Sequence, residues 1–243
     1  MTSTENILRT IHAALGQEPA IDLERFPVHA SFAEGDVVLE AEVENVAAKK
    51  LTLELVGSVP GVDRIVDRLR VSPAERMPDA RERELVCNTL LEEPALINCT
   101  IGAGTLEHID VFREPTSERS GEITVQVENG VVTLDGQVPS LSHKRLAGVL
   151  AWWVPGTRDV INGLEETPPQ EDNDDEVTDA VLLVLEKDPF VNASEIRVST
   201  RNRLVTLEGL VPKPEHRQMA ESDAWYIFGV DRVINRLVVR ALT

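Results

Sequence analysis

Residues 130–138 read GVVTLDGQV, and two other stretches of the chain follow the same pattern. Residues 203–211, 73 positions later, read RLVTLEGLV, and residues 35–43, 95 positions earlier, read GDVVLEAEV. A second motif, VINGL at 160–164, keeps the same two offsets, because it aligns with VINRL in the later copy and with IVDRL in the earlier one. Two motifs in register at three places indicate internal repeats, which decide the domain count and the fold of each domain.

The third copy shows the first half of the expected unit most clearly. Acidic residues at 174–176 begin a helix, and Asp188-Pro189 ends it. The apolar residues of this helix recur at helical spacing, and they are Val177, Val181, Val184 and Leu185. Residues 196–200 alternate as a strand, and residues 204–211 form a second strand in a hairpin.

The second half of the unit follows from prolines and glycines. Pro214 can occupy the first turn of a second helix, and Phe228-Gly229 ends that helix before a strand at 232–239. The second strand, second helix and third strand form a crossover, which should be right-handed. The predicted fold class is therefore α+β, with three tandem αββαβ domains, each a three-stranded mixed sheet with two helices packed on one face.

The repeats divide the 243 residues into three predicted domains: a divergent first domain at 1–71, a second at 80–166 and a third at 174–243. The second domain carries an insertion of about 21 residues near 101–121. We expect this insertion to be a long loop or to contain one extra strand at 107–112. Domains of this size are marginal alone, so neighbouring repeats should share buried surface.

The charge of the chain limits its partners. Lys and Arg total 24 against 42 Asp and Glu, which gives a formal net charge of −18. No run of Lys and Arg is available to neutralise phosphates, so we expect no nucleic-acid partner. Simple electrostatic attraction to anionic lipid is disfavoured for the same reason.

The expected location follows from what the sequence lacks. The first residues have neither a basic start nor an apolar core typical of a secretion signal, and no stretch of about 18 apolar residues predicts a transmembrane segment. We therefore expect a cytoplasmic protein. The two cysteines, Cys87 and Cys99, are expected to be reduced and buried.

The repeated residues resemble the BON (bacterial OsmY and nodulation) domain family, in three tandem copies. The resemblance is carried by glycines and asparagines of the hairpin and of the closing strand, namely Gly61, Gly130, Gly136, Gly156, Asn162, Gly209, Gly229 and Asn235. It implies an αββαβ fold and a non-enzymatic module that binds phospholipid or a small ligand in an envelope-related or osmotic-stress role. The first copy departs from the pattern, because Ala41 stands where the others have Gly136 and Gly209.

Four aromatic residues are the candidate binding or interface residues. Trp152 and Trp153 in the second copy align with Trp225 and Tyr226 in the third, whereas the first copy has Gly57-Ser58 there. They lie beside the stripe of the second helix that faces the sheet. Each pair could flank the core of its own domain, or it could cover a contact between repeats, a subunit interface or a lipid-binding edge.

The sequence thus predicts a non-enzymatic binding protein. No set of acid, base and nucleophile is repeated or clustered, so no catalytic residue is assigned, and neither a metal ion nor a cofactor is expected. The resemblance implies a phospholipid or a small ligand as the partner. The alternative is a self-associating, homo-oligomeric or protein-binding scaffold that uses the aromatic residues of the second helices as its interface.

Overall fold

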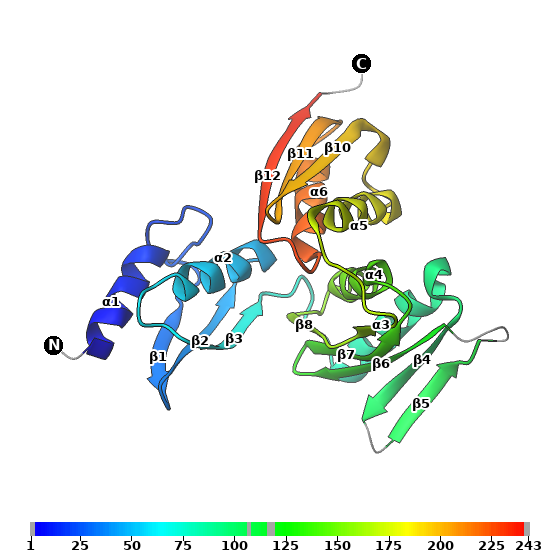
Figure 1. Ribbon diagram of the computed structural model, residues 1–243, viewed down its shortest axis with the longest axis horizontal. Helices are drawn as coiled ribbons and strands as arrows, with labels where there is room; N and C mark the ends of the chain where they lie inside the picture. Colours follow the sequence, from blue (N-terminus) through cyan, green and yellow to red (C-terminus); the bar gives the residue numbers. More distant parts are fainter. Residues whose placement is uncertain (1–2, 106–107, 116–119, 241–243) are drawn as a thin grey trace. The chain divides into compact units, whose positions relative to one another are not determined.

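The computed structural model describes residues 3–105, 108–115 and 120–240, and the chain divides into two compact units, Met1–Ser72 and Pro73–Thr243 (Figure 1). The first unit contains the first repeat, and the second unit contains the second and third repeats. The finer division into domains 80–166 and 174–243 stays a prediction. No helix among the described residues is long and apolar enough to cross a membrane.

The first repeat has the predicted αββαβ order. Its elements are α1 (Ser3–Leu15), β1 (His29–Ala33), β2 (Asp36–Val43), α2 (Val46–Gly57) and β3 (Ile65–Val71). Strand β1 is antiparallel to β2, and β2 is parallel to β3, so the sheet is mixed. Val37, Leu39 and Val43 of β2 are buried, as expected for alternate residues of a strand with one covered face.

The third repeat follows the sequence-based expectation closely. Its elements are α5 (Asp174–Lys187), η2 (Ala193–Glu195), β10 (Ile196–Arg201), β11 (Leu204–Val211), α6 (Pro214–Tyr226) and β12 (Arg232–Val239). The sheet has the order β10-β11-β12, antiparallel and then parallel. The predicted α+β class with three αββαβ repeats is confirmed.

The second repeat has more strands than the expected three. Its elements are α3 (Asp79–Glu92), η1 (Pro94–Leu96), β4 (Cys99–Thr105), β5 (His108–Arg113), β6 (Gly121–Glu128), β7 (Val131–Val138), α4 (Leu141–Trp152), β8 (Asp159–Asn162) and β9 (Glu165–Glu166). Strands β8 and β9 pair with β7 in one register, so they are two halves of the expected third strand. The inserted strands β4 and β5 widen the sheet beyond β6.

The insertion therefore differs from the expected loop or single strand. The expected strand at 107–112 corresponds to β5, although residues 106 and 107 lie outside the described part of the chain. Strand β4 was missed because Gly102 and Gly104 weaken its strand pattern. A Cβ on Gly104 would lie 2.0 Å from the His108 carbonyl oxygen, so the close pairing with β5 needs glycine.

The strand glycines allow a close backbone approach inside each hairpin. Gly209 has φ 144°, and a Cβ there would lie 2.0 Å from the Glu195 carbonyl oxygen; Gly136 has the same environment in the second repeat. In the first repeat the pairing of β1 with β2 ends at Glu40. Ala41 therefore pairs with Leu69 of β3 but has no β1 residue opposite it, which explains why this copy can do without glycine.

We expect Gly209→Ala to lower the free energy of unfolding of the second unit by about 2 kcal/mol, since the new Cβ meets a backbone atom in a conformation unfavourable for alanine. Gly35→Ala is the matched control. Gly35 has φ 95° but nothing within 4 Å of its Cβ position, so only about 1 kcal/mol of backbone strain should appear. Urea unfolding of each variant measures both values, and equal losses would contradict the close-approach argument.

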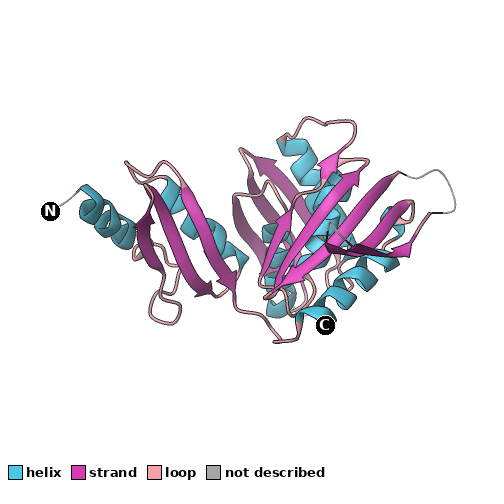
Figure 2. Ribbon diagram, turned by 90° about the horizontal axis from the view of Figure 1, so that it is seen from below, coloured by secondary structure: helices cyan, strands magenta, loops and turns pink. Residues whose placement is uncertain are grey.

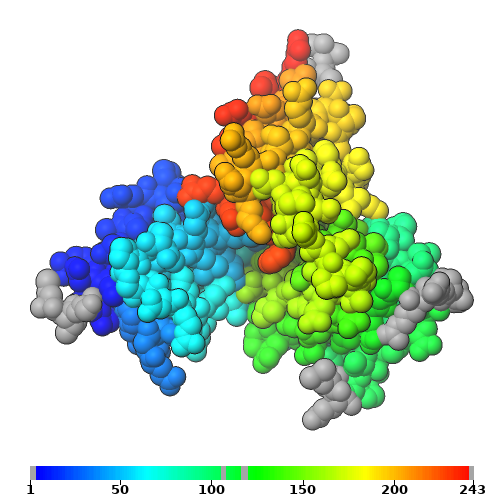
Figure 3. Space-filling view, in the orientation of Figure 1, coloured from blue at the N-terminus to red at the C-terminus, as the bar shows by residue number. Residues whose placement is uncertain are grey.

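The second and third repeats pack helix layer against helix layer. Helix α4 contacts both α5 and α6, so the order of layers is sheet, α3 and α4, α5 and α6, sheet (Figures 1 and 2). Val149 of α4 belongs to the core cluster of the third repeat, and Trp153 packs against the clusters of both repeats. The green and yellow atoms of the two repeats meet in Figure 3. Helix α4 thus contributes side chains to the cores of both repeats.

Candidate functional site

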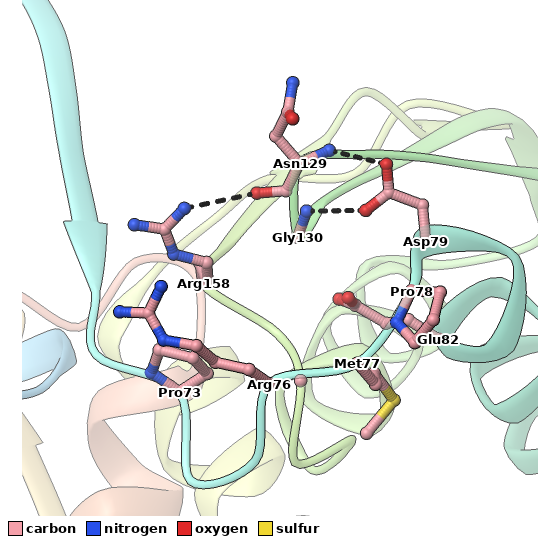
Figure 4. Close-up of a pocket in the computed structure, with 10 residues that line it drawn as sticks. Pro73, Arg76, Met77, Pro78, Asp79, Glu82, Asn129, Gly130 and Arg158 are labelled. Atoms are coloured by element: carbon pink, nitrogen blue, oxygen red, sulfur yellow. Dashed lines mark hydrogen bonds between the residues drawn. The ribbon is translucent and has the colours of Figure 1, made fainter.

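A pocket of about 330 Å³ opens in the second repeat, where the chain enters α3 (Figure 4). Its walls come from the segment before α3, the first turn of α3, the β6–β7 turn and the loop before β8. Four of the ten lining residues are ionisable, namely Arg76, Asp79, Glu82 and Arg158. The two arginines approach from the side opposite Glu82 in the view of Figure 4.

The frame of the pocket is held by backbone hydrogen bonds. Asn129 and Gly130 in the β6–β7 turn donate their N–H groups to the two carboxylate oxygens of Asp79, at 2.9 and 3.0 Å. The Glu75 N–H donates to the Pro155 carbonyl oxygen at 3.1 Å, which ties the preceding segment to the loop before β8. In the third repeat Asp174 accepts from the N–H groups of Asn202 and Arg203 in the same way, so this frame belongs to the repeat.

Glu82 occupies a position where the other repeats place an apolar residue. In α3 it begins a stripe that continues with Val86 and Leu90, both fully buried. The corresponding stripe of α5 is Val177, Val181 and Leu185, and that of α1 is Ile7, Ile11 and Leu15. A carboxyl group at a core-facing position costs stability, so its presence in one repeat alone calls for a role.

The Glu82 side chain is buried but incompletely satisfied. The residue is 1% exposed, and its Oε1 has no hydrogen-bond partner in the part of the chain that the structure describes. Burial raises its pKa above the usual value; a hydrogen bond with Thr157 and the charge of Arg158 oppose this shift, and Asp79 adds to it. A buried carboxyl oxygen beside the pocket is therefore left without a hydrogen-bond donor among the described residues.

The same place in the fold is filled differently in each repeat, beside the glycine that follows the second helix. A Cβ on Gly61 would lie 2.9 Å from Ile7 Cδ1, so an apolar side chain fills the first repeat. A Cβ on Gly229 would lie 3.2 Å from Arg145 Nη2, so a guanidinium fills the third. The Gly156 position in the second repeat borders Met77 and Glu82 and lines the open pocket.

Arg145 of α4 enters the third repeat from its neighbour. Its side chain is 1% exposed, and it forms an ion pair with Asp172. Its Nε donates to the Phe228 carbonyl oxygen at 3.0 Å, and its Nη1 donates to the Glu176 carbonyl oxygen at 3.5 Å. Beside Gly229 the third repeat thus holds a guanidinium paired with a carboxylate, where the second repeat has the side chains of Met77 and Glu82.

Three of the four predicted aromatic residues lie at the contact between the second and third repeats. Trp152 stacks on Tyr226 with ring centroids 5.7 Å apart, and Trp153 Nε1 donates to Asp223 Oδ1 at 2.9 Å. Trp225 is 6% exposed, and its Nε1 has no hydrogen-bond partner among the described residues. This arrangement favours the inter-repeat interpretation of Trp152, Trp153 and Tyr226 over a free lipid-binding edge.

Asp223 is a buried acid within this contact. Burial raises its pKa to about 8; the Trp153 hydrogen bond opposes the shift, and the neighbouring carboxyl of Asp188 adds to it. Burial and the Asp223 charge also raise the pKa of Tyr226. The two aspartates can share a proton, so the contact is most favourable when Asp223 is protonated.

The motif residues serve two purposes. Gly130 and Gly156 line the pocket, whereas Asn162 and Asn235 lie in the third strands and hold the second helices. Asn162 Nδ2 donates to the Lys144 carbonyl oxygen at 2.7 Å, and Asn235 Nδ2 donates to the Arg217 carbonyl oxygen at 2.9 Å. In the first repeat an ion pair of Lys49 with Asp67 replaces this link, at 3.0 Å.

Sequence reasoning missed the charged residues of the pocket. Only Glu82 carried a usable signal, because it replaces an apolar residue in a repeated helix stripe once α3 and α5 are aligned by their starts. Arg76 and Arg158 carried no comparable signal. Among the residues that the structure describes, no group of three or more His, Cys, Asp or Glu side chains could hold a metal ion.

Comparison with known families and structures identifies the class of the protein. The BON domain model matches residues 3–73, 115–168 and 173–241. These matches cover most of the chain, so the chain belongs to the BON domain family, with three tandem copies. This family is generally non-catalytic.

Two solved structures of CdsD, described as a structural protein of the type III secretion system of Chlamydia trachomatis, are similar at 16% sequence identity. They cover 98% of this chain, which in turn covers 100% of the C-terminal domain in one structure and 93% of the chain in the other. The TM-score is 0.25 in both cases, which does not establish a shared arrangement.

Proposed function

We propose that this chain is a non-catalytic binding protein that takes a small polar ligand in the pocket of its second repeat. The observation that carries this proposal is Glu82, a buried carboxyl at a core-facing position that lines the pocket and has one oxygen without a hydrogen-bond partner among the described residues. Pockets of a few hundred Å³ with a few convergent polar groups are typical of small-molecule sites. Beside the equivalent glycines the first and third repeats place Ile7 and Arg145, whereas the second repeat places Met77 and Glu82 and so brings an acid without a full set of partners to this position.

The chemistry of the pocket favours a small polar ligand over a phospholipid chain. Its lining brings two arginines and two acids together around about 330 Å³, and an acyl chain would place apolar surface against these charged groups. A scaffold that self-associates through the aromatic residues is less favoured, because Trp152, Trp153 and Tyr226 already make contacts within one chain.

We expect Glu82→Val, which restores the residue type of Val177, to stabilise the second unit by about 1–2 kcal/mol and to abolish binding of small polar ligands. A buried polar group that is retained for function typically lowers the free energy of unfolding, and replacing it with an apolar residue raises that free energy again. Urea unfolding followed by tryptophan fluorescence measures the stability, since all three tryptophans lie in this unit. A thermal-shift screen with small polar compounds compares wild type with variant.

Glu92→Val is the matched control, because Glu92 is an exposed residue at the end of the same helix. It should neither stabilise the protein nor change any ligand-induced shift. If Glu82→Val destabilised the protein, Glu82 would be a structural acid and the proposed function would fail.

A further inference from the structure

The occupied site of the third repeat indicates what the open pocket of the second repeat accepts. At Gly229 a guanidinium from Arg145 is paired with a carboxylate from Asp172. At Gly156 the Cβ position borders the Met77 side chain, whose Cγ lies 2.8 Å away, and the carboxyl group of Glu82, whose Oε2 lies 3.1 Å away. Glu82 Oε1 has no hydrogen-bond partner among the described residues, so a bound ligand is needed to supply its donor.

We infer that the pocket binds a small zwitterion of the amino-acid type, with a guanidinium or ammonium group at Glu82 and a carboxylate at Arg76 and Arg158. This inference rests on the proposed function and names its ligand class. Guanidinium and ammonium groups carry only donors, which match an unpartnered carboxylate oxygen. A guanidinium can also reach a carboxylate with two parallel hydrogen bonds.

The arginines on the opposite wall of the pocket favour a negatively charged group at the other end of the ligand. Arg76 and Arg158 both line the pocket, and the Arg158 charge already acts on Glu82. A ligand with a cation alone would place positive charge beside two arginines. A ligand carboxylate offsets that charge, and it can accept from guanidinium groups in addition to their existing contacts. The volume of about 330 Å³ is at the lower end for ligand pockets, which fits one amino acid.

Isothermal titration calorimetry of the full chain tests the inference with three probes. These probes are L-arginine, which has both charges; agmatine, which lacks the carboxylate; and propionate, which lacks the cation. We expect L-arginine to bind, agmatine to bind at least fivefold more weakly, and propionate to give no saturable heat. Glu82→Gln keeps the shape of the side chain but removes its charge, and it should weaken L-arginine binding at least tenfold, while Glu92→Gln should leave binding unchanged.

Several results would overturn the zwitterion assignment. The first three are the absence of L-arginine binding to wild type, equal binding of agmatine and L-arginine, and saturable propionate binding. The fourth is an unchanged affinity of Glu82→Gln for L-arginine, provided that this variant unfolds at the same urea concentration as wild type. The proposed function is judged separately by the stability of Glu82→Val and by the screen of polar compounds. A stabilised Glu82→Val variant that also loses another ligand would sustain the pocket and reject this ligand class.

Discussion

Replacing Arg145 with methionine is expected to lower the free energy of unfolding of the second unit by about 3 kcal/mol. The substitution leaves the Asp172 carboxylate without its main partner, and the carbonyl oxygens of Phe228 and Glu176 lose their donors. Removing one member of a buried ion pair typically costs about 3–5 kcal/mol. We place this case at the lower end, because the Asp172 side chain is 22% exposed and Arg203 lies 3.6 Å from it.

Tryptophan fluorescence during urea unfolding measures this effect for the second unit, which contains all three tryptophans. Arg197→Met is the control, because Arg197 is exposed on β10, and the change should stay within about 0.5 kcal/mol. The double variant Arg145→Met with Asp172→Leu should recover part of the loss, since no buried charge is then left alone. Equal losses in Arg145→Met and Arg197→Met would show that the inter-repeat ion pair does not hold the two repeats together.

The second large effect concerns Asp223, and it depends on pH. The pKa of Asp223 is about 8 in the folded protein, against 3.8 as the ordinary value. Between these values the folded state keeps a proton that the unfolded chain has released, so stability falls as pH rises from about 4 to 8. Asp223→Asn removes this loss, and asparagine can still accept the Trp153 Nε1–H. We expect the variant to be more stable than wild type by on the order of 3–5 kcal/mol above pH 8, and similar to wild type near pH 4.

Urea unfolding of wild type and Asp223→Asn at pH 5, 6.5, 8 and 9 measures this difference. The advantage of the variant should grow with pH and then level off above about pH 8. Asp179→Asn is the control, because Asp179 is exposed on α5 and the change should add no pH-dependent difference. An advantage of Asp223→Asn that stayed constant across the series would show that the carboxyl is already ionised in the folded protein.

Local patterns were sufficient to predict most helices and strands. The spacing of Val177, Val181 and Leu185 predicted α5, because an apolar stripe at helical spacing needs no information from elsewhere in the chain. The alternation at 204–211 predicted β11 for a similar reason. Strand β4 was missed, since its two glycines are favourable only next to the backbone of β5, a neighbour that the local pattern of β4 does not reveal.

The residues of the candidate site were harder to predict from the sequence. The aromatic residues were recognised as special, but their contacts join positions about 70 residues apart, so a sequence pattern left core, interface and lipid contact open. Glu82 could have been noticed as an acid in an apolar stripe. Arg145 could not, because its acceptor at Phe228 is 83 positions away and an arginine on a helix surface is ordinary.

The αββαβ repeats and their number follow from the order of residues, because turn chemistry and apolar periodicity act between near neighbours along the chain. The shared helix α4, the open pocket and the buried acids depend on which surfaces meet after the repeats have folded. Burial and charge pairing are properties of atoms brought together from distant positions, so Glu82, Arg145 and Asp223 acquire their energetic roles only in the packed unit.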